Sequence, residues 1–388
     1  MSSRTRQFTL ILSVPLLAFV LVGGLLGKTI TRSNTYQQLR IFEDVISLVT
    51  NNYVEEVEID RVMTGALRGL VDSLDADSAY LTVEQVTKME SGYPTSEADV
   101  GLSLTRRYYL QTIAARDGSA AEQSGLEPGD YIRTIDGKST RNMSVFEGSK
   151  LLRGEEGSVV SLTVIRGDAT DPKNIELMRR LPLPPTVSTE FAELGTGYIR
   201  ISAFGPKITQ LIEAETTSLL NKHITNLIID VRRTAEGPLS SGLTTARLFV
   251  SEGILGSLEI RGTEPKSVVA NPNISLTALP IAVLIDAGTA GAAELFAAAL
   301  SGNNRAELIG MQTAGRVGLQ ELVKLPDGSG LWLTHGRYLN PSNQPIHEVG
   351  LEPDIHVNVP SHEFGTTQSD TDPILERAFE YLNLKKVA

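Results

Sequence analysis

The stretch that decides the fold runs from Pro280 to Gln320 and reads PIAVLIDAGTAGAAELFAAALSGNNRAELIGMQTAGRVGLQ. Its first segment, Ile281 to Ile285, is apolar throughout, as expected for a strand covered on both faces of its sheet. A turn of small residues then leads into an Ala-rich helix, predicted from about Ala292 to Leu300. A second strand is predicted at 306–309, and a Gly-rich turn follows at 315–318. In open α/β sheets chemistry collects at such strand-to-helix turns, because helix N–H groups point outward there.

The same alternation extends outward from this stretch, in the order strand 198–202, helix 208–220, strand 227–231 and helix 242–250. It predicts a layered α/β core at residues 186–360 with a largely parallel sheet. Further strands are predicted at 331–333 and 334–339, and an amphipathic helix is predicted within the closing region 361–388. The fold class expected for the whole chain is multidomain α/β.

Residues 99–180 form a separate predicted unit. A Gly turn at 100–102 runs into a strand, and a Pro-Gly turn at 128–129 follows a short helix. The strand at 131–138 ends in an Asp-Gly turn, which is a strong hairpin signal. A helix is predicted at 143–152 and an alternating strand at 158–166. The Pro-rich segment 168–185 is predicted to be a polar connector between this unit and the core.

The N-terminal part predicts a membrane anchor followed by helices. Arg4 and Arg6 precede an apolar run from Phe8 to Gly27, which is long enough to span a bilayer as a helix. Residues 1–30 are therefore interpreted as an uncleaved anchor, with a cleaved signal peptide as the alternative. The arginines orient the N-terminus toward the cytoplasm and the rest of the chain outward. Residues 31–98 are predicted to be a helical region.

Composition excludes several classes of function. The formal net charge of −11 argues against nucleic acid as the main partner. The absence of cysteine excludes disulfides and thiol catalysis. The five histidines show no metal-ligand spacing such as HExxH, so neither a metal site nor a cofactor is predicted.

The stretch 280–320 resembles the active-site segment of the carboxyl-terminal processing peptidases, which are tail-specific serine proteases with a Ser–Lys dyad. The resemblance places the serine at Gly291 and the lysine twenty-five residues on, at Arg316. A glutamine that assists the lysine in some members matches Gln320. The chain thus has the frame of the family and lacks both principal catalytic groups.

The loop that the resemblance assigns to the oxyanion donors is altered as well. A family pattern of two glycines corresponds here to Glu236 and Gly237, and an acidic side chain is expected to repel a developing oxyanion. These departures predict a pseudoprotease. The alternative is a serine-type endopeptidase that uses non-standard groups, for which Thr289, Ser240 and Ser241 are the candidate nucleophiles.

The unit at 99–180 resembles a PDZ domain, through Gly-Leu-Glu-Pro-Gly-Asp at 125–130 and Ile-Asp-Gly at 135–137. The resemblance implies that a protein C-terminal tail binds as an added strand along the sheet edge at 102–104. Its carboxylate would lie at the backbone N–H groups of residues 100–102. The implied peptide-binding residues are Val100, Gly101, Leu102, Ser103 and Leu104. A PDZ fold that binds nothing is the alternative.

Taken with the anchor, the resemblance implies an inner-membrane protein whose bulk faces the periplasm or exterior. The partners expected from it are protein tails or peptides. An active protease relative and self-association remain open as further partners.

Overall fold

The computed structural model describes residues 30–91, 97–167, 171–192, 195–359, 364 and 371–387. It divides into two compact units, Met1–Leu70 and Val71–Ala388. In the first unit lie α2 (Ile30–Asn52) and most of α3 (Ile59–Asp72). Leu39, Phe42 and Val49 of α2 are exposed. The predicted anchor at 1–30 falls almost entirely outside the described residues, and no helix within the described ranges is long and apolar enough to cross a membrane.

The central sheet of the second unit has the order β17-β14-β13-β10-β9-β8. All neighbouring strands are parallel except β8, which is antiparallel to β9. The bounds are β8 (Val187–Phe191), β9 (Thr196–Ile201), β10 (Asn226–Asp230), β13 (Ile281–Ile285), β14 (Ala306–Gly310) and β17 (Ile355–His356). β10 and β13 are buried at every residue, as their apolar sequences predict for strands covered on both faces.

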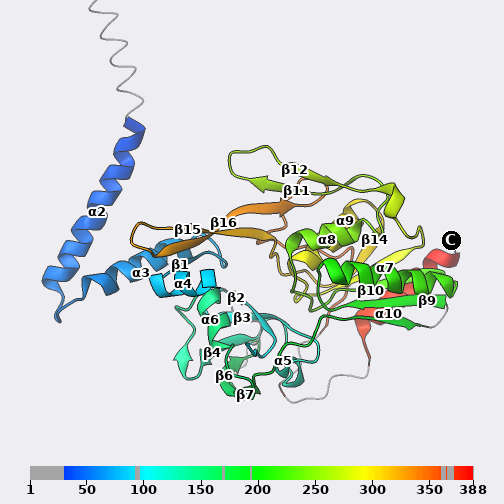
Figure 1. Cartoon of the computed structure of the whole chain (residues 1–388), viewed down its shortest axis with the longest axis horizontal. Coiled ribbons are helices and arrows are strands. Elements are labelled where there is room, and N and C mark those ends of the chain that lie inside the picture. Colours follow the sequence, from blue (N-terminus) through cyan, green and yellow to red (C-terminus); the bar gives the residue numbers. More distant parts are fainter. Residues whose placement is uncertain are drawn as a thin grey trace, which may run out of the picture. The chain divides into compact units, whose positions relative to one another are not determined.

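Alternate residues of these strands pack against different helices. Ile229 and Val283 join the cluster formed with α7 (Pro206–Asn221), α8 (Leu239–Ala246) and α9 (Ala292–Gly302). Ile228 and Leu284 join the cluster formed with α10 (Pro373–Val387). The core is therefore a three-layer α/β/α arrangement, with α10 alone covering one face among the described helices (Figure 1).

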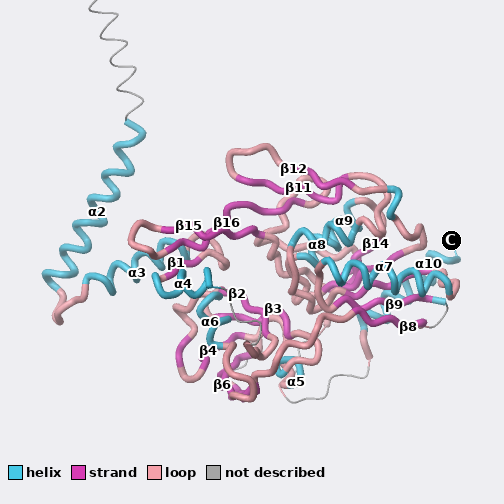
Figure 2. Tube along the Cα trace, in the orientation of Figure 1, coloured by secondary structure: helices cyan, strands magenta, loops and turns pink. Residues whose placement is uncertain are grey.

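A second sheet has the order β1-β16-β11-β12, with β15 paired to β16. Its strands are β1 (Ala79–Leu81), β11 (Ile254–Ile260), β12 (Lys266–Val269), β15 (Gly318–Lys324) and β16 (Gly330–Leu339). The helix α4 (Val83–Ser91) follows β1, and the short helix η2 (Pro272–Ile274) follows β12. Figure 2 shows β15 and β16 side by side as a long ribbon. The two strands predicted at 331–333 and 334–339 form one continuous strand, β16.

The third sheet belongs to residues 97–180, here called the PDZ-like unit. Its order is β2-β3-β4-β6-β7, with β5 paired to β4. The strands are β2 (Leu102–Arg106), β3 (Leu110–Ala115), β4 (Tyr131–Ile135), β5 (Lys138–Ser139), β6 (Val159–Ile165) and β7 (Lys173–Met178). The helices are α5 (Ala120–Gln123) and α6 (Val145–Leu151), and α6 lies along β2.

The prediction of a polar connector at 168–185 was wrong for its central part. Residues 173–178 form β7, which pairs antiparallel with β6 over six residues. Ile175 and Leu177 alternate with polar residues and point into the core of the PDZ-like unit, so the segment has the period of a half-buried strand.

Candidate functional site

Gly291 stands at the turn between β13 and α9. It has φ 63° and ψ −117°, a region that favours glycine and strains other residues. A Cβ built at this position would lie 3.4 Å from Leu239 Cδ2 and 3.6 Å from the carbonyl oxygen of Arg316, which are ordinary contacts. The turn therefore has room for a side chain, and its backbone is the sharp, strained strand-to-helix type on which nucleophiles are presented.

Glu294 fixes this turn to the loop that carries Arg316. Its carboxylate is fully buried and accepts hydrogen bonds from the backbone N–H groups of Gly291 (3.0 Å), Gly315 (2.6 Å) and Arg316 (2.7 Å). The hydroxyl of Thr313 donates to it as well, at 2.5 Å. Burial raises the pKa of Glu294, and these donors oppose the rise. Sequence reasoning missed this residue, although a glutamate three positions into a helix is a recognised capping signal.

The side chain of Arg316 joins three parts of the unit. Its guanidinium donates to the carboxylate of Asp77, in the turn before β1, and to the hydroxyl of Thr105 on β2. Burial lowers the pKa of Arg316 to about 10, so the group is still almost wholly charged at neutral pH. A charged guanidinium held by a carboxylate cannot accept a proton.

Gln320 lies on β15, four residues beyond Arg316. Its Nε2 is 3.4 Å from the hydroxyl of Thr334 on the paired strand β16. No hydrogen bond between Gln320 and Arg316 joins the two side chains in the described structure. The glutamine is thus placed beside the loop without a polar contact to the arginine.

The loop after β10 faces the PDZ-like unit. The Glu236 carboxylate accepts a hydrogen bond from Arg116 Nε at 2.7 Å, and Arg116 also pairs with both carboxylate oxygens of Asp99 at 3.0 Å. The charge of Glu236 is partly compensated by Arg116, which is shared with Asp99. Gly237 has φ 120°, and a Cβ there would lie 2.0 Å from the carbonyl oxygen of Phe204, so only glycine fits.

One cavity of about 650 Å³ brings these groups together with the edge strand of the PDZ-like unit. Its lining includes Val100, Leu102, Ser103, Leu104, Glu236, Gly237, Gly291, Arg316 and Gln320. Gly101 lies outside this lining, as do the candidate nucleophiles Thr289, Ser240 and Ser241. Val145, Ser149 and Leu152, on and just after α6, form another wall. The two dyad positions assigned by the resemblance and the predicted peptide groove are therefore parts of one hollow.

The PDZ-like unit packs directly on the loops of the core. Ile113 and Ala114 of β3 form an apolar cluster with Ala290, the residue before Gly291. Arg200 of β9 donates to the Asp117 carboxylate at 2.9 Å, which adds an ion pair to that of Arg116 with Glu236. These contacts keep the groove beside the turn at Gly291.

None of the three hydroxyl candidates lines the cavity. Thr289 is buried, and its hydroxyl lies 3.0 Å from the Val231 carbonyl oxygen and 3.2 Å from Asp286 Oδ1, so it closes the turn. Ser240 is exposed and Ser241 is buried within α8.

Both imidazole nitrogens of the buried His347 lack a partner within the described structure, and burial lowers the pKa of this side chain. In the described residues no cluster of three or more His, Cys, Asp or Glu side chains is placed to hold a metal ion.

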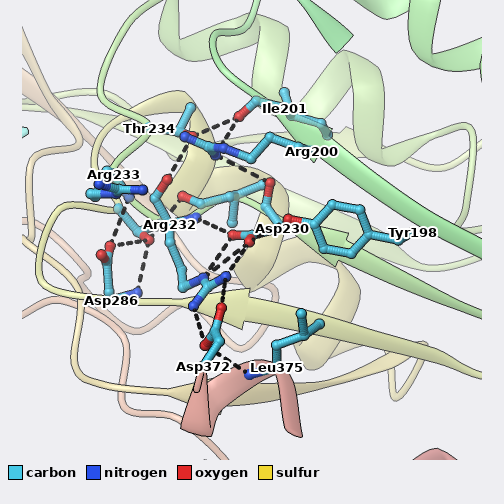
Figure 3. Close-up of polar contacts among 12 residues, drawn as sticks. Tyr198, Arg200, Ile201, Asp230, Arg232, Arg233, Thr234, Asp286, Asp372 and Leu375 are labelled. Carbon is cyan, nitrogen blue, oxygen red and sulfur yellow. Dashed lines mark hydrogen bonds and ion pairs between the residues drawn. The ribbon is translucent and has the colours of Figure 1, made fainter. Parts of the chain in front are cut away.

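A buried network behind the site anchors the C-terminal helix (Figure 3). Arg232 pairs with Asp230 at 2.5 Å and with both carboxylate oxygens of Asp372 at 2.8 Å. The Tyr198 hydroxyl donates to Asp230 at 2.8 Å. Burial favours the neutral form of Asp230, but Arg232 outweighs it and holds the pKa of this carboxyl below its usual range. The network places the start of α10 next to the loop that leads to Glu236.

Two protein-family models match the chain, one in the α/β core and one in the PDZ-like unit. A family model described as peptidase family S41 matches residues 195–357, and a PDZ domain model matches residues 113–166. The first range contains positions 236, 237, 291, 316 and 320, whereas the groove residues 100–104 precede the second range.

Two relatives and one solved structure align with most of the chain. The carboxyl-terminal-processing protease of Synechocystis sp. is 32% identical over 345 residues, covering 86% of this chain and 80% of the relative. The carboxy-terminal-processing protease of Bartonella bacilliformis is 29% identical over 343 residues, covering 86% and 78%. The solved photosystem II D1 C-terminal processing protease has a TM-score of 0.69 and 26% identity, covering 82% of this chain and 92% of that protein.

Proposed function

Because this chain belongs to the carboxyl-terminal processing proteases of peptidase family S41, we propose that it is an inactive member that binds protein C-terminal tails without cutting them. The observation that carries the proposal is the pair of residues at the two dyad positions, Gly291 and Arg316. The backbones at the two positions lie close together, because a Cβ built on Gly291 would be 3.6 Å from the Arg316 carbonyl oxygen.

Acyl transfer needs a nucleophilic oxygen, a neutral base and oxyanion donors. Gly291 offers no oxygen, so no acyl-enzyme forms there. Arg316 stays protonated and is held by Asp77, so it offers no base. Loss of the nucleophile and base of a serine protease costs about a millionfold in rate. The structure of the site therefore favours binding over hydrolysis.

The binding half of the proposal rests on the edge strand β2. Within the described residues β2 pairs with β3 alone, so its other edge is open to the cavity beside α6. An extended tail can add to such an edge through main-chain hydrogen bonds, with side chains held by the groove walls. The partly buried Leu102 and Val145 supply apolar surface for a tail that ends in an apolar residue.

We propose further that residues 8–27 anchor the protein in the inner membrane of a bacterial envelope, with the bulk outside the cytoplasm. The support is the length of the apolar run and the arginines that precede it. An anchored tail-binding protein would hold its partners at the membrane surface.

The experiment incubates the full chain, purified in detergent, with a fluorescent peptide that has an apolar last residue and with an unfolded protein bearing the same tail. We expect saturable binding of the peptide and an intact protein substrate. The matched control is Gly101→Val, because a Cβ at this residue would lie 2.2 Å from Ser119 Cβ and distort the start of β2.

The rival function is a serine-type endopeptidase with non-standard groups, since the curated relatives are named proteases. Cleavage of the unfolded substrate by the unmodified chain would overturn the proposal of inactivity. If that cleavage disappeared on Ser240→Ala or Ser241→Ala, the substitute nucleophile would be identified.

A further inference from the structure

The start of the groove already contains a carboxylate of the protein itself. Asp99 Oδ1 accepts a hydrogen bond from the backbone N–H of Gly101 at 2.9 Å. Gly101 lies in the segment 100–102, where the PDZ resemblance puts the carboxylate of a bound tail. Asp99 is fixed there, because its own N–H donates to the Arg180 carbonyl oxygen at 3.0 Å and its carbonyl oxygen accepts from Arg180 N–H at 2.9 Å.

The charges around Asp99 also oppose the binding of a tail carboxylate. Arg116 is the cation beside Asp99, and it is shared with Glu236 across the cavity. Two carboxylates thus share one guanidinium, and all three side chains are at least partly buried. An arriving tail carboxylate would be the third negative group around a single cation, in a site where water screens the repulsion only in part.

We infer that Asp99 is a specificity-determining residue that competes with the tail carboxylate for the N–H of Gly101 and for Arg116. The inference rests on the proposed tail binding and adds that this groove discriminates only weakly in favour of a free C-terminus. Tails bind mainly through main-chain pairing with β2 and through their apolar side chains. Extended segments with a neutral end are therefore accepted nearly as well as tails with a free acid.

The role of Asp99 can be tested by removing its charge while keeping its hydrogen bond to Gly101. In Asp99→Asn a carbonyl oxygen can still accept from Gly101 N–H, while the net charge of the group formed by residues 99, 116 and 236 rises from −1 to zero. Arg116 then keeps one acidic partner and is available to a tail carboxylate. Removal of one like charge at this range corresponds to a gain on the order of fivefold in affinity for the free acid.

The experiment measures fluorescence anisotropy of one peptide in two forms, the free acid and the C-terminal amide, with the full chain in detergent. Wild type, Asp99→Asn and the control Glu156→Gln are compared. Glu156 is an exposed carboxylate of the same unit outside the cavity lining, so it matches the charge change alone. We expect the acid-to-amide affinity ratio to rise about fivefold in Asp99→Asn and to stay constant in Glu156→Gln.

The possible outcomes are distinguishable. A free acid that is strongly preferred by wild type, with the same ratio in Asp99→Asn, overturns the role of Asp99 and leaves tail binding intact. Failure of both peptide forms to bind every variant overturns tail binding itself. Asp99→Ser, which keeps a short acceptor for Gly101, replaces Asp99→Asn if the latter melts below wild type, and the same rise in the ratio is expected.

Discussion

At the scale of single residues, the proposed inactivity depends on the absence of a side chain at Gly291 and on the ion pair of Arg316. The backbone of Gly291 keeps the strained conformation of a nucleophile turn, which costs another residue about 1–3 kcal/mol. Glycine removes this cost. Glu294 holds the turn and the Arg316 loop in place, so the backbones of the two dyad positions stay adjacent.

This frame predicts how reactivity can be restored. Gly291→Ser with Arg316→Lys returns a hydroxyl and an amine, but Asp77 would hold the new lysine in its charged form. We therefore expect faint labelling by a serine-reactive fluorophosphonate in the double variant. Addition of Asp77→Asn should raise the labelling, because an amide stabilises the ammonium less than a carboxylate does. In-gel fluorescence of the labelled protein gives the measurement.

The control for this rescue is Gly291→Ala with Arg316→Lys and Asp77→Asn, which repeats the backbone strain without a hydroxyl. Labelling of the control would place the reactive group elsewhere. A triple variant with serine that folds and never labels would show that positions 291 and 316 do not form a dyad frame.

The family resemblance of one segment is enough to assign residues to the dyad positions. It does not predict their partners. Asp77 and Thr105 lie 239 and 211 residues from Arg316, and Arg116 lies 120 residues from Glu236. Such pairings depend on how three sheets meet, which no local pattern encodes.

At the scale of elements, the attachment of α10 depends on its first residues. Asp372 pairs with Arg232 and accepts from the N–H of Leu375 at 3.1 Å, so it both caps the helix and anchors it. We expect Asp372→Ala to lower the free energy of unfolding by about 2 kcal/mol, allowing for the partial exposure of the carboxylate. Amide hydrogen exchange should increase chiefly in α10. Urea unfolding and exchange measurements check the two effects.

Glu380→Gln is the matched control on the same helix. Glu380 forms an exposed pair with Arg377 at 2.8 Å, and such pairs contribute at most about 1 kcal/mol. Equal stability of the two variants would contradict an anchoring role for Asp372.

Helices and strands are predicted correctly where an apolar pattern continues over many residues. They are missed where the pattern is short or interrupted by polar residues. β10 and β13 follow directly from uninterrupted apolar runs. β7 was missed because prolines flank a six-residue alternation, and β15 because its residues are largely polar or partly exposed. Strands of this kind are stabilised by pairing to a neighbour, which is a tertiary effect.

At the scale of the whole molecule, the N-terminal run predicts the orientation of the chain. A reporter enzyme that works only outside the cytoplasm, fused after Ala388, should be active, because the proposed orientation has Arg4 and Arg6 on the cytoplasmic side. Replacement of both arginines by glutamate should reduce this activity. Activity of a cytoplasm-dependent reporter at the same fusion point would contradict the proposed orientation, and a mature protein that begins near Leu25 would contradict the uncleaved anchor.

The covering of one sheet face by α10 also sets the order in which this chain completes its fold at the ribosome. Ile228, Leu284 and Ile309 are synthesised long before Ile374 and Leu382, which bury them. Until α10 has emerged from the ribosome, the growing core carries a bare apolar face. Nascent chains with such a face are prone to aggregate, so docking of α10 removes an aggregation risk from this core.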